Sequence, residues 1–147
     1  MTTHTTLSHV PIYCKFRNDL EFHPIQKFVL ELYGIKEEAP LQKIPVKQSD
    51  SDRRPIDYEP VEISFVPNQP SKITKMRLHF ANTTGNNNRK RNRPNPDQRY
   101  FLLVVEIQII TKNKNIFTMC SSVSERVIVR VCQFRHILIE ETYFILL

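Results

Sequence analysis

The densest cluster of charge in the chain lies in the stretch Asn86–Phe101, NNNRKRNRPNPDQRYF. Five of its side chains are basic within eleven residues, and four of those five are arginine. A guanidinium group presents a rigid fork of N–H donors that fits phosphate oxygens and the edge of guanine, and side-chain amides can pair with adenine. Two prolines restrict the stretch, which lowers the cost of ordering it on binding. These residue types predict a nucleic-acid-binding surface formed by Arg89, Lys90, Arg91, Arg93 and Arg99, with the amides of Asn86, Asn87, Asn88 and Gln98.

Charge is close to balanced in the rest of the chain. The 147 residues have a formal net charge of +6. Residues 63–105 hold 8 Lys and Arg against a single acidic residue, Asp97, so their net charge is +7. Residues 1–62 have a net charge of −2, and residues 106–147 have a net charge of +1. This asymmetry favours a polyanionic partner contacted by one face, and a solvated, solubilising loop is the alternative.

Side chains that could carry out catalysis are scattered along the sequence. The five histidines form no motif, and His79, on an expected strand near Arg77, reads as a solvent-facing side chain. The adjacent pairs Glu37–Glu38 and Glu140–Glu141 would point to opposite faces of a strand. Three cysteines at no metal-ligand spacing are typical of a reducing compartment. We expect a binding module and not an enzyme, with no metal, no cofactor and no small-molecule substrate.

The elements that position the basic stretch are predicted to be β-strands. Apolar and polar residues alternate over Pro60–Phe65 and Ile73–Phe80, and Tyr100–Ile110 is apolar on both faces of its first half. In Ile73–Phe80 the alternation places two sets of side chains on opposite faces of the strand, Met76, Leu78 and Phe80 on one and Lys75, Arg77 and His79 on the other. Five to seven strands joined by long loops predict an all-β fold, an antiparallel β-sandwich. Further predictions are a buried strand or short helix over Lys27–Ile35, a surface loop over Glu37–Pro55, a turn at Lys112–Asn115 and a last strand over Ser124–Val131.

The N-terminal residues 1–10 are rich in Thr, His and Ser, and we expect them to be disordered. They lack the charged and apolar regions of a signal peptide. No apolar run approaches the roughly 20 residues that span a bilayer, so we expect no membrane segment in this chain. The chain has only 2 glycines, which predicts few tight two-residue hairpins.

Several motifs together resemble one known family. NNNRKRNRPNPDQRYFLLVV and SERVIVRV, preceded in order by LELYGIK, QSDSDRRP and ITKMRLHFANTT, are similar to the DNA-binding domain of the myelin regulatory factor family. That domain belongs with the PhoG-like domains of fungal meiotic regulators. The resemblance covers roughly Pro11 to Val131 and implies an immunoglobulin-like β-sandwich that binds double-stranded DNA through loops at one end. It also implies a transcription factor that acts in the nucleus.

The resemblance also assigns DNA-contacting residues. Those of the basic stretch are expected mainly to contact phosphate, whereas Gln98 and Arg99 would brace the loop or approach bases. Arg130, at the end of an outward-facing row, would reach either. Which arginine reads guanine stays open. The full set that the resemblance implies is Arg77, Arg89, Lys90, Arg91, Arg93, Gln98, Arg99 and Arg130.

The sequence also departs from this family. Family members begin with further strands and continue past the position of Val131 with an Asn-Pro-Gly loop. Here residues 132–147 diverge, so the expected organisation is a disordered segment 1–10, a partial PhoG-like domain 11–131 and a divergent tail 132–147. The family's self-cleaving domain, coiled coil and transmembrane helix, which release a trimeric nuclear factor from a membrane-anchored precursor, find no counterpart in the sequence. Any homo-oligomer would therefore form through regions outside it.

Two other functions fit the same residues. The run RKRNR alone is typical of a nuclear import signal, so the chain would then be a β-sandwich interaction module or a truncated regulatory isoform that does not bind DNA. Binding to single-stranded RNA would need exposed aromatic side chains for stacking. Near polar segments the sequence offers Tyr58, Tyr100 and Phe101, and Phe101 is expected in the core.

Overall fold

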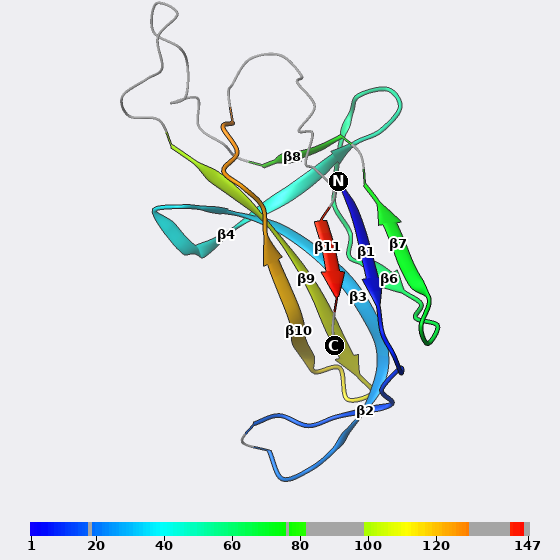
Figure 1. Ribbon diagram of the computed structural model, residues 1–147. Helices are drawn as coiled ribbons and strands as arrows, with labels where there is room; N and C mark the ends of the chain where they lie inside the picture. Colours follow the sequence, from blue (N-terminus) through cyan, green and yellow to red (C-terminus); the bar gives the residue numbers. More distant parts are fainter. Residues whose placement is uncertain (18, 76, 82–98, 130–141, 146–147) are drawn as a thin grey trace, which may run out of the picture.

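The computed structural model describes residues 1–17, 19–75, 77–81, 99–129 and 142–145. Within these residues the chain forms β-strands and no helix, as the sequence predicts (Figure 1). The strands are β1 (Thr2–Thr6), β2 (Tyr13–Cys14), β3 (His23–Lys36), β4 (Ala39–Ser49), β5 (Pro55–Asp57), β6 (Val61–Ile63), β7 (Pro70–Thr74), β8 (Leu78–Phe80), β9 (Phe101–Thr111), β10 (Ile116–Val123) and β11 (Thr142–Ile145).

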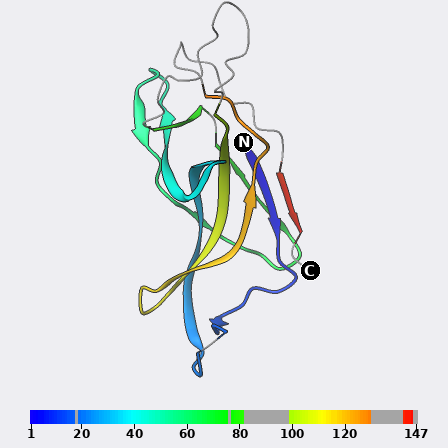
Figure 2. The same ribbon diagram turned by 90° about the vertical axis from the view of Figure 1, so that its left-hand side faces the viewer.

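The described strands form two sheets. The larger has the order β10-β9-β3-β4-β5, with β2 and β6 paired to β3 and with β8 paired to β4. The smaller has the order β11-β1-β7, in which β1 is parallel to β11 and antiparallel to β7. The smaller sheet lies along one face of the larger one in both views (Figures 1 and 2), and Ile73 and Met1 pack against the core residues of the larger sheet. The predicted all-β sandwich is therefore confirmed.

The core is centred on the antiparallel pair β3 and β9. Their register runs from Ile25 opposite Thr111 to Lys36 opposite Phe101. Leu30 and Ile107, which face each other across this pair, are 1% and 0% exposed. Burying each such side chain contributes about 1.5–3 kcal/mol relative to leaving it in water. The strands predicted over Lys27–Ile35 and Tyr100–Ile110 are confirmed, and the turn predicted after β9 leads into β10.

The segment Glu37–Pro55, predicted to be a surface loop, is instead mostly strand. β4 fills it, pairs with β3 at Tyr33 opposite Pro45, and buries Ile44 and Val46. A proline inside a strand normally removes a ladder hydrogen bond. Here the carbonyl of Pro45 accepts a hydrogen bond from the N–H of Ala81 at 2.8 Å, so β4 still forms a backbone hydrogen bond to a neighbouring segment at its proline. The prediction of long loops also fails at this point, because Lys36 pairs with Ala39 across a two-residue turn.

The segment Ile73–Phe80, predicted to be one strand, is divided. β7 ends at Thr74 in the smaller sheet, and β8 begins at Leu78 in the larger sheet. Arg77 lies in the break with φ of 56°, a left-handed backbone angle that alternation of side chains cannot reveal. The predicted orientation holds within β8, where Leu78 and Phe80 are buried.

The N-terminal residues, predicted to be disordered, contain a paired strand. β1 is antiparallel to β7, and the side chains of Thr3 and Thr5 are 1% and 2% exposed. Threonine is β-branched and suits a pleated, half-buried surface, which composition alone does not show. The N-terminal ammonium also donates a hydrogen bond to the carbonyl of Lys75 at 3.0 Å.

The last strand, predicted over Ser124–Val131, is not formed in its described part, residues 124–129. A single bridge joins Val127 to Phe101 there. At the end of β10, the N–H of Ser124 still donates a hydrogen bond to the carbonyl of Leu103 at 2.9 Å, but the N–H of Leu103 donates to the hydroxyl oxygen of Ser124, also at 2.9 Å, and not to a backbone carbonyl. Val127 and Val129 still pack partly buried against the core, so the predicted inward side is correct for both. Residues 130 and 131 lie outside the described residues.

Candidate nucleic-acid interface

The structure describes two of the eight predicted DNA-contacting residues, Arg77 and Arg99. The other six lie outside the described residues: Arg89, Lys90, Arg91, Arg93, Gln98 and Arg130. Five of these six belong to residues 82–98, which we call the basic segment. The structure shows what holds the chain on either side of this segment.

Both flanks of the basic segment are fixed in the core, and they lie next to each other. Before it, β8 pairs with β4, and Ala81 is 6% exposed. After it, the carbonyl of Tyr100 accepts a hydrogen bond from the N–H of Glu37 at 3.1 Å. Phe101 exchanges two backbone hydrogen bonds with Val127, of 2.9 and 2.7 Å. The rings of Phe80 and Phe101 stack at a centroid distance of 5.8 Å, so the residues that precede and follow the segment meet.

Gly34 makes room for this ring stack. A Cβ atom added at Gly34 would lie 2.5 Å from Cδ1 and 2.6 Å from Cε1 of Phe80, well inside van der Waals contact. Gly34 lies on β3 opposite Ile44 of β4 and Leu103 of β9. The absence of a side chain at Gly34 therefore lets the Phe80 ring pack directly against the backbone of the central strand.

The turn between β3 and β4 carries two carboxylates that pair with arginines near the flank of the basic segment. Both Nε and Nη2 of Arg126 donate to Oε1 of Glu37, at 2.8 and 2.7 Å. The Arg126 guanidinium also lies 5.2 Å from the centre of the Tyr100 ring. Arg99 has Nε 3.7 Å from Oε1 of Glu38. Solvent-exposed pairs of this kind contribute at most about 1 kcal/mol each, but they orient the chain where it leaves the basic segment.

The position of Arg126 in this arrangement was not foreseen from the sequence. The one hint in the sequence is the adjacent acidic pair Glu37–Glu38, since a carboxylate pair is a natural partner for arginines elsewhere in the chain. The pairing joins residues 89 positions apart, which local patterns cannot reveal.

Arg77 makes its contacts with the turn between β4 and β5. Nη1 of Arg77 donates a hydrogen bond of 2.6 Å to the carbonyl of Asp50. The carbonyl of Arg77 accepts a hydrogen bond from the N–H of Ser49 at 3.0 Å. The β4–β5 turn, β8, the start of β9 and residues 124–129 all lie at the same end of the molecule, uppermost in Figures 1 and 2.

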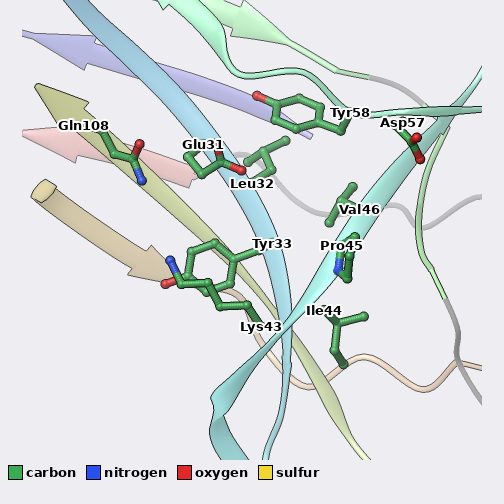
Figure 3. Close-up of a pocket in the computed structure, with 10 residues that line it drawn as sticks. All are labelled: Glu31, Leu32, Tyr33, Lys43, Ile44, Pro45, Val46, Asp57, Tyr58 and Gln108. Carbon is green, nitrogen blue, oxygen red and sulfur yellow. The ribbon is translucent and has the colours of Figure 1, made fainter. Parts of the chain in front are cut away.

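A hollow of about 420 Å³ opens on the larger sheet and is lined by residues of β3, β4, β5 and β9 and by Tyr58 (Figure 3). Its polar groups largely satisfy one another. Glu106 accepts hydrogen bonds from the Tyr33 hydroxyl and from Nε2 of Gln108, the second at 3.0 Å. Nζ of Lys43 lies 3.9 Å from the centre of the Tyr33 ring and 3.7 Å from Glu106. Burial, followed by the hydrogen bond to Glu106, raises the pKa of Tyr33 to about 12. We infer that this network stabilises the sheet.

The ionisation of Glu106 should make the fold sensitive to acid. Burial alone raises the pKa of Glu106, but hydrogen bonds from Tyr33, Gln108 and Thr118 and the charge of Lys43 outweigh it and lower the pKa overall. A carboxyl with a lowered pKa in the folded state stabilises above its unfolded pKa and loses that contribution as pH falls. The unfolding free energy should therefore drop by about 1 kcal/mol between roughly pH 5 and 3 through this group.

Urea unfolding at a series of pH values measures this effect. Glu106→Gln should be less stable at pH 7 and should show a flatter loss of stability in acid. Glu31→Gln is the control, because burial raises the pKa of Glu31 and its protonation acts in the opposite direction. An unchanged acid profile in Glu106→Gln would contradict the assignment.

Among the described residues, no three His, Cys, Asp or Glu side chains gather in a way that could hold a metal ion. Within the same residues, no helix is long and apolar enough to cross a membrane.

Comparison with known proteins gives consistent matches. Residues 2–133 match the NDT80/PhoG-like DNA-binding family. The chain is 42% identical over 122 residues to Myelin regulatory factor homolog 1 of Caenorhabditis elegans, an alignment that covers 82% of this chain and 13% of that protein. It is 30% identical over 116 residues to an uncharacterised protein of Dictyostelium discoideum, covering 74% of this chain and 10% of that protein. The chain thus spans only a small part of the length of these relatives.

Proposed function

Because the chain belongs to the NDT80/PhoG-like DNA-binding family, we propose that it is the sequence-specific, double-stranded-DNA-binding domain of a transcription factor that regulates RNA polymerase II transcription in the nucleus. The family match over residues 2–133 is the observation that carries this proposal. The fold supports it, since the segment of highest positive charge begins and ends at one place in the core.

The proposed binding surface is the end of the sandwich that carries the basic segment. Arg89, Lys90, Arg91 and Arg93 contact phosphates, which positions the domain on the duplex without reading sequence. Gln98 and Arg130 are the candidates for contact with base edges in the major groove. Arg99, paired with Glu38, braces the segment, and Arg77 belongs to the same end of the molecule.

The remaining parts of the longer relatives suggest the setting in which the domain works. Following the resemblance to the myelin regulatory factor family, we propose that the domain reaches the nucleus as part of a fragment cleaved from a membrane-anchored precursor. Oligomers would form through regions outside this chain. The domain alone would then bind one copy of its DNA site with modest affinity, and linked copies would bind with far higher avidity.

Fluorescence anisotropy of the purified chain tests the proposal. A randomised duplex pool and a duplex enriched by repeated selection are titrated at about 0.05 and 0.2 M salt. Neutralising 6–10 phosphates would lower the affinity by roughly 10³–10⁵ between these concentrations. We expect this salt dependence, with clear preference for the enriched duplex.

Weak binding without preference, at both salt concentrations, would contradict the proposal and favour an interaction module. In that case the run RKRNR would serve only in nuclear import. Replacing RKRNR with neutral residues and fusing an unrelated import signal separates the two functions in cells. The added signal should restore nuclear import whether or not RKRNR contacts DNA. Regulation of a reporter gene should be lost only if RKRNR also contacts DNA.

A further inference from the structure

The turn between β4 and β5, Asp50–Arg54, has a backbone fixed by its own hydrogen bonds. The N–H of Asp50 donates to the carbonyl of Arg54 at 3.0 Å, and the N–H of Arg53 donates to the carbonyl of Asp50 at 3.2 Å. The Asp50 carboxylate accepts a hydrogen bond from the N–H of Arg54 at 2.7 Å. Arg53 has φ of 64°, so the turn is closed without a glycine. A turn closed in this way is ordered before any partner arrives.

A second layer of contacts ties this turn to β8. The Arg77 guanidinium donates to the carbonyl of Asp50 at 2.6 Å, and the N–H of Ser49 donates to the carbonyl of Arg77 at 3.0 Å. Arg77 follows the break between β7 and β8, where its own φ is 56°. The unusual backbone of Arg77 thus coincides with the point where its side chain reaches the turn.

The two arginines at the tip of the turn, Arg53 and Arg54, point their charge to solvent. Both residues are exposed, and among the described residues neither side chain has an ion-pair or hydrogen-bond partner. By contrast, Arg99 and Arg126 at the same end of the molecule lie beside Glu38 and Glu37. The N–H donors of both guanidinium groups are therefore available to form charge-assisted hydrogen bonds with an anion such as a phosphate.

The length of β8 separates the β4–β5 turn from Ala81, the residue at which the chain enters the basic segment. Arg77 marks the end of β8 next to the turn, and Ala81 is the residue that precedes the basic segment. Four residues of extended chain span about 13 Å. The major groove of B-DNA is about 12 Å wide, with phosphates along both edges. The turn and the residue at which the chain enters the basic segment are therefore separated by about one groove width, which is the spacing that contact with both phosphate rows requires.

We propose that Arg53 and Arg54 form a second phosphate-binding element, and that Arg77 is a positioning residue that holds their turn in shape. The inference rests on the proposed DNA-binding function and adds contacts that the sequence resemblance did not assign. Asp50 and Asp52 lie in the same turn and reduce its net charge. The element therefore contributes less to affinity than the basic segment does, and it works by orienting the domain on the duplex.

The double variant Arg53→Gln/Arg54→Gln tests the phosphate contacts. Losing two phosphate contacts should raise Kd for any duplex by roughly 5- to 30-fold at about 0.15 M salt and reduce the slope of log Kd against log salt by about 1–2. The matched control is Lys112→Gln/Lys114→Gln, in the exposed turn between β9 and β10 at the opposite end of the molecule (Figure 1). It removes the same charge, and Lys114 has φ of 67°, close to that of Arg53. The control should change Kd by less than about twofold.

The outcomes separate this inference from the proposed function. If the unmodified chain binds duplexes and the arginine pair changes Kd no more than the lysine pair does, the second element is wrong and DNA binding stands. If the unmodified chain binds no duplex, both proposals fail together.

The positioning role of Arg77 has its own measurement. Arg77→Gln should weaken DNA binding and speed hydrogen exchange of the Arg54 amide, which the ordered turn protects. Added to the Arg53→Gln/Arg54→Gln variant, Arg77→Gln should lower affinity little further. Unchanged exchange at Arg54, combined with a fully additive loss of affinity, would show instead that Arg77 contacts DNA directly.

Discussion

Replacing Arg89, Lys90, Arg91 and Arg93 together with glutamine should weaken binding to every duplex by about a thousandfold at 0.15 M salt. Each phosphate neutralised releases condensed counterions, so four lost contacts should reduce the slope of log Kd against log salt by about 3.6. The loss should be nearly equal for random and selected duplexes, because phosphate contacts carry no sequence information. Anisotropy titrations of both duplexes across a salt series measure affinity and slope together.

The lysine pair Lys112→Gln/Lys114→Gln removes two positive charges where the fourfold variant removes four, so twice its effect on log Kd gives the part of the loss that net charge alone causes. Circular dichroism and thermal unfolding of the fourfold variant should match those of the unmodified chain, because the substitutions lie outside the described core. A fourfold variant that kept both its affinity and its salt slope would show that the basic segment is not the phosphate-binding surface. A loss of affinity for the selected duplex alone would show instead that residues among Arg89–Arg93 contact bases.

Gly34→Ala should destabilise the fold by about 3 kcal/mol, at the upper end of the usual range for overpacking. The added methyl group would lie 2.5 Å from the Phe80 ring, and neither the backbone at residue 34 nor the Phe80 ring can shift easily. Gly34 belongs to the central strand, and Phe80 is stacked on Phe101. About 3 kcal/mol corresponds to a decrease of roughly 150-fold in the folding equilibrium constant. Urea unfolding followed by circular dichroism measures the change.

A double-mutant cycle with Phe80→Leu shows whether the clash is the cause. The smaller side chain leaves room for the methyl group, so Gly34→Ala should cost clearly less in the Phe80→Leu background, with a coupling energy of about 1 kcal/mol or more. As a surface control, Leu41→Ala should be close to neutral, since Leu41 is 98% exposed. Strictly additive effects of Gly34→Ala and Phe80→Leu would refute the steric explanation.

Local sequence patterns predict those strands whose own residues form an apolar run or a clear alternation. β9 is recognisable because Phe101 to Val105 is apolar on both faces, and β3 because Phe28 to Leu30 is a continuous apolar run. β4 is not recognisable, because two prolines mask the inward positions of Ile44 and Val46. The break at Arg77 is hidden because a left-handed backbone angle at a non-glycine residue leaves no trace in the pattern.

The candidate site shows the same division. The basic residues of the segment 82–98 stand out from composition alone. What holds the segment does not, because the Phe80–Phe101 stack and the Arg126–Glu37 pair join residues distant in sequence. The turn with Arg53 and Arg54 lies in a stretch that the sequence presents only as a polar loop, where the charges of Asp50 and Asp52 hide its arginines.

The stacked rings of Phe80 and Phe101 have a consequence for divergence among relatives. Since the chain enters and leaves the basic segment at a single point of the core, residues can be inserted there or removed without moving any strand. Doubling the length of such a loop costs only about 0.6 kcal/mol in closure entropy. Under the proposed function, relatives can therefore change the contacts that this segment makes with DNA through its length and residues, while the strands that form the core stay the same.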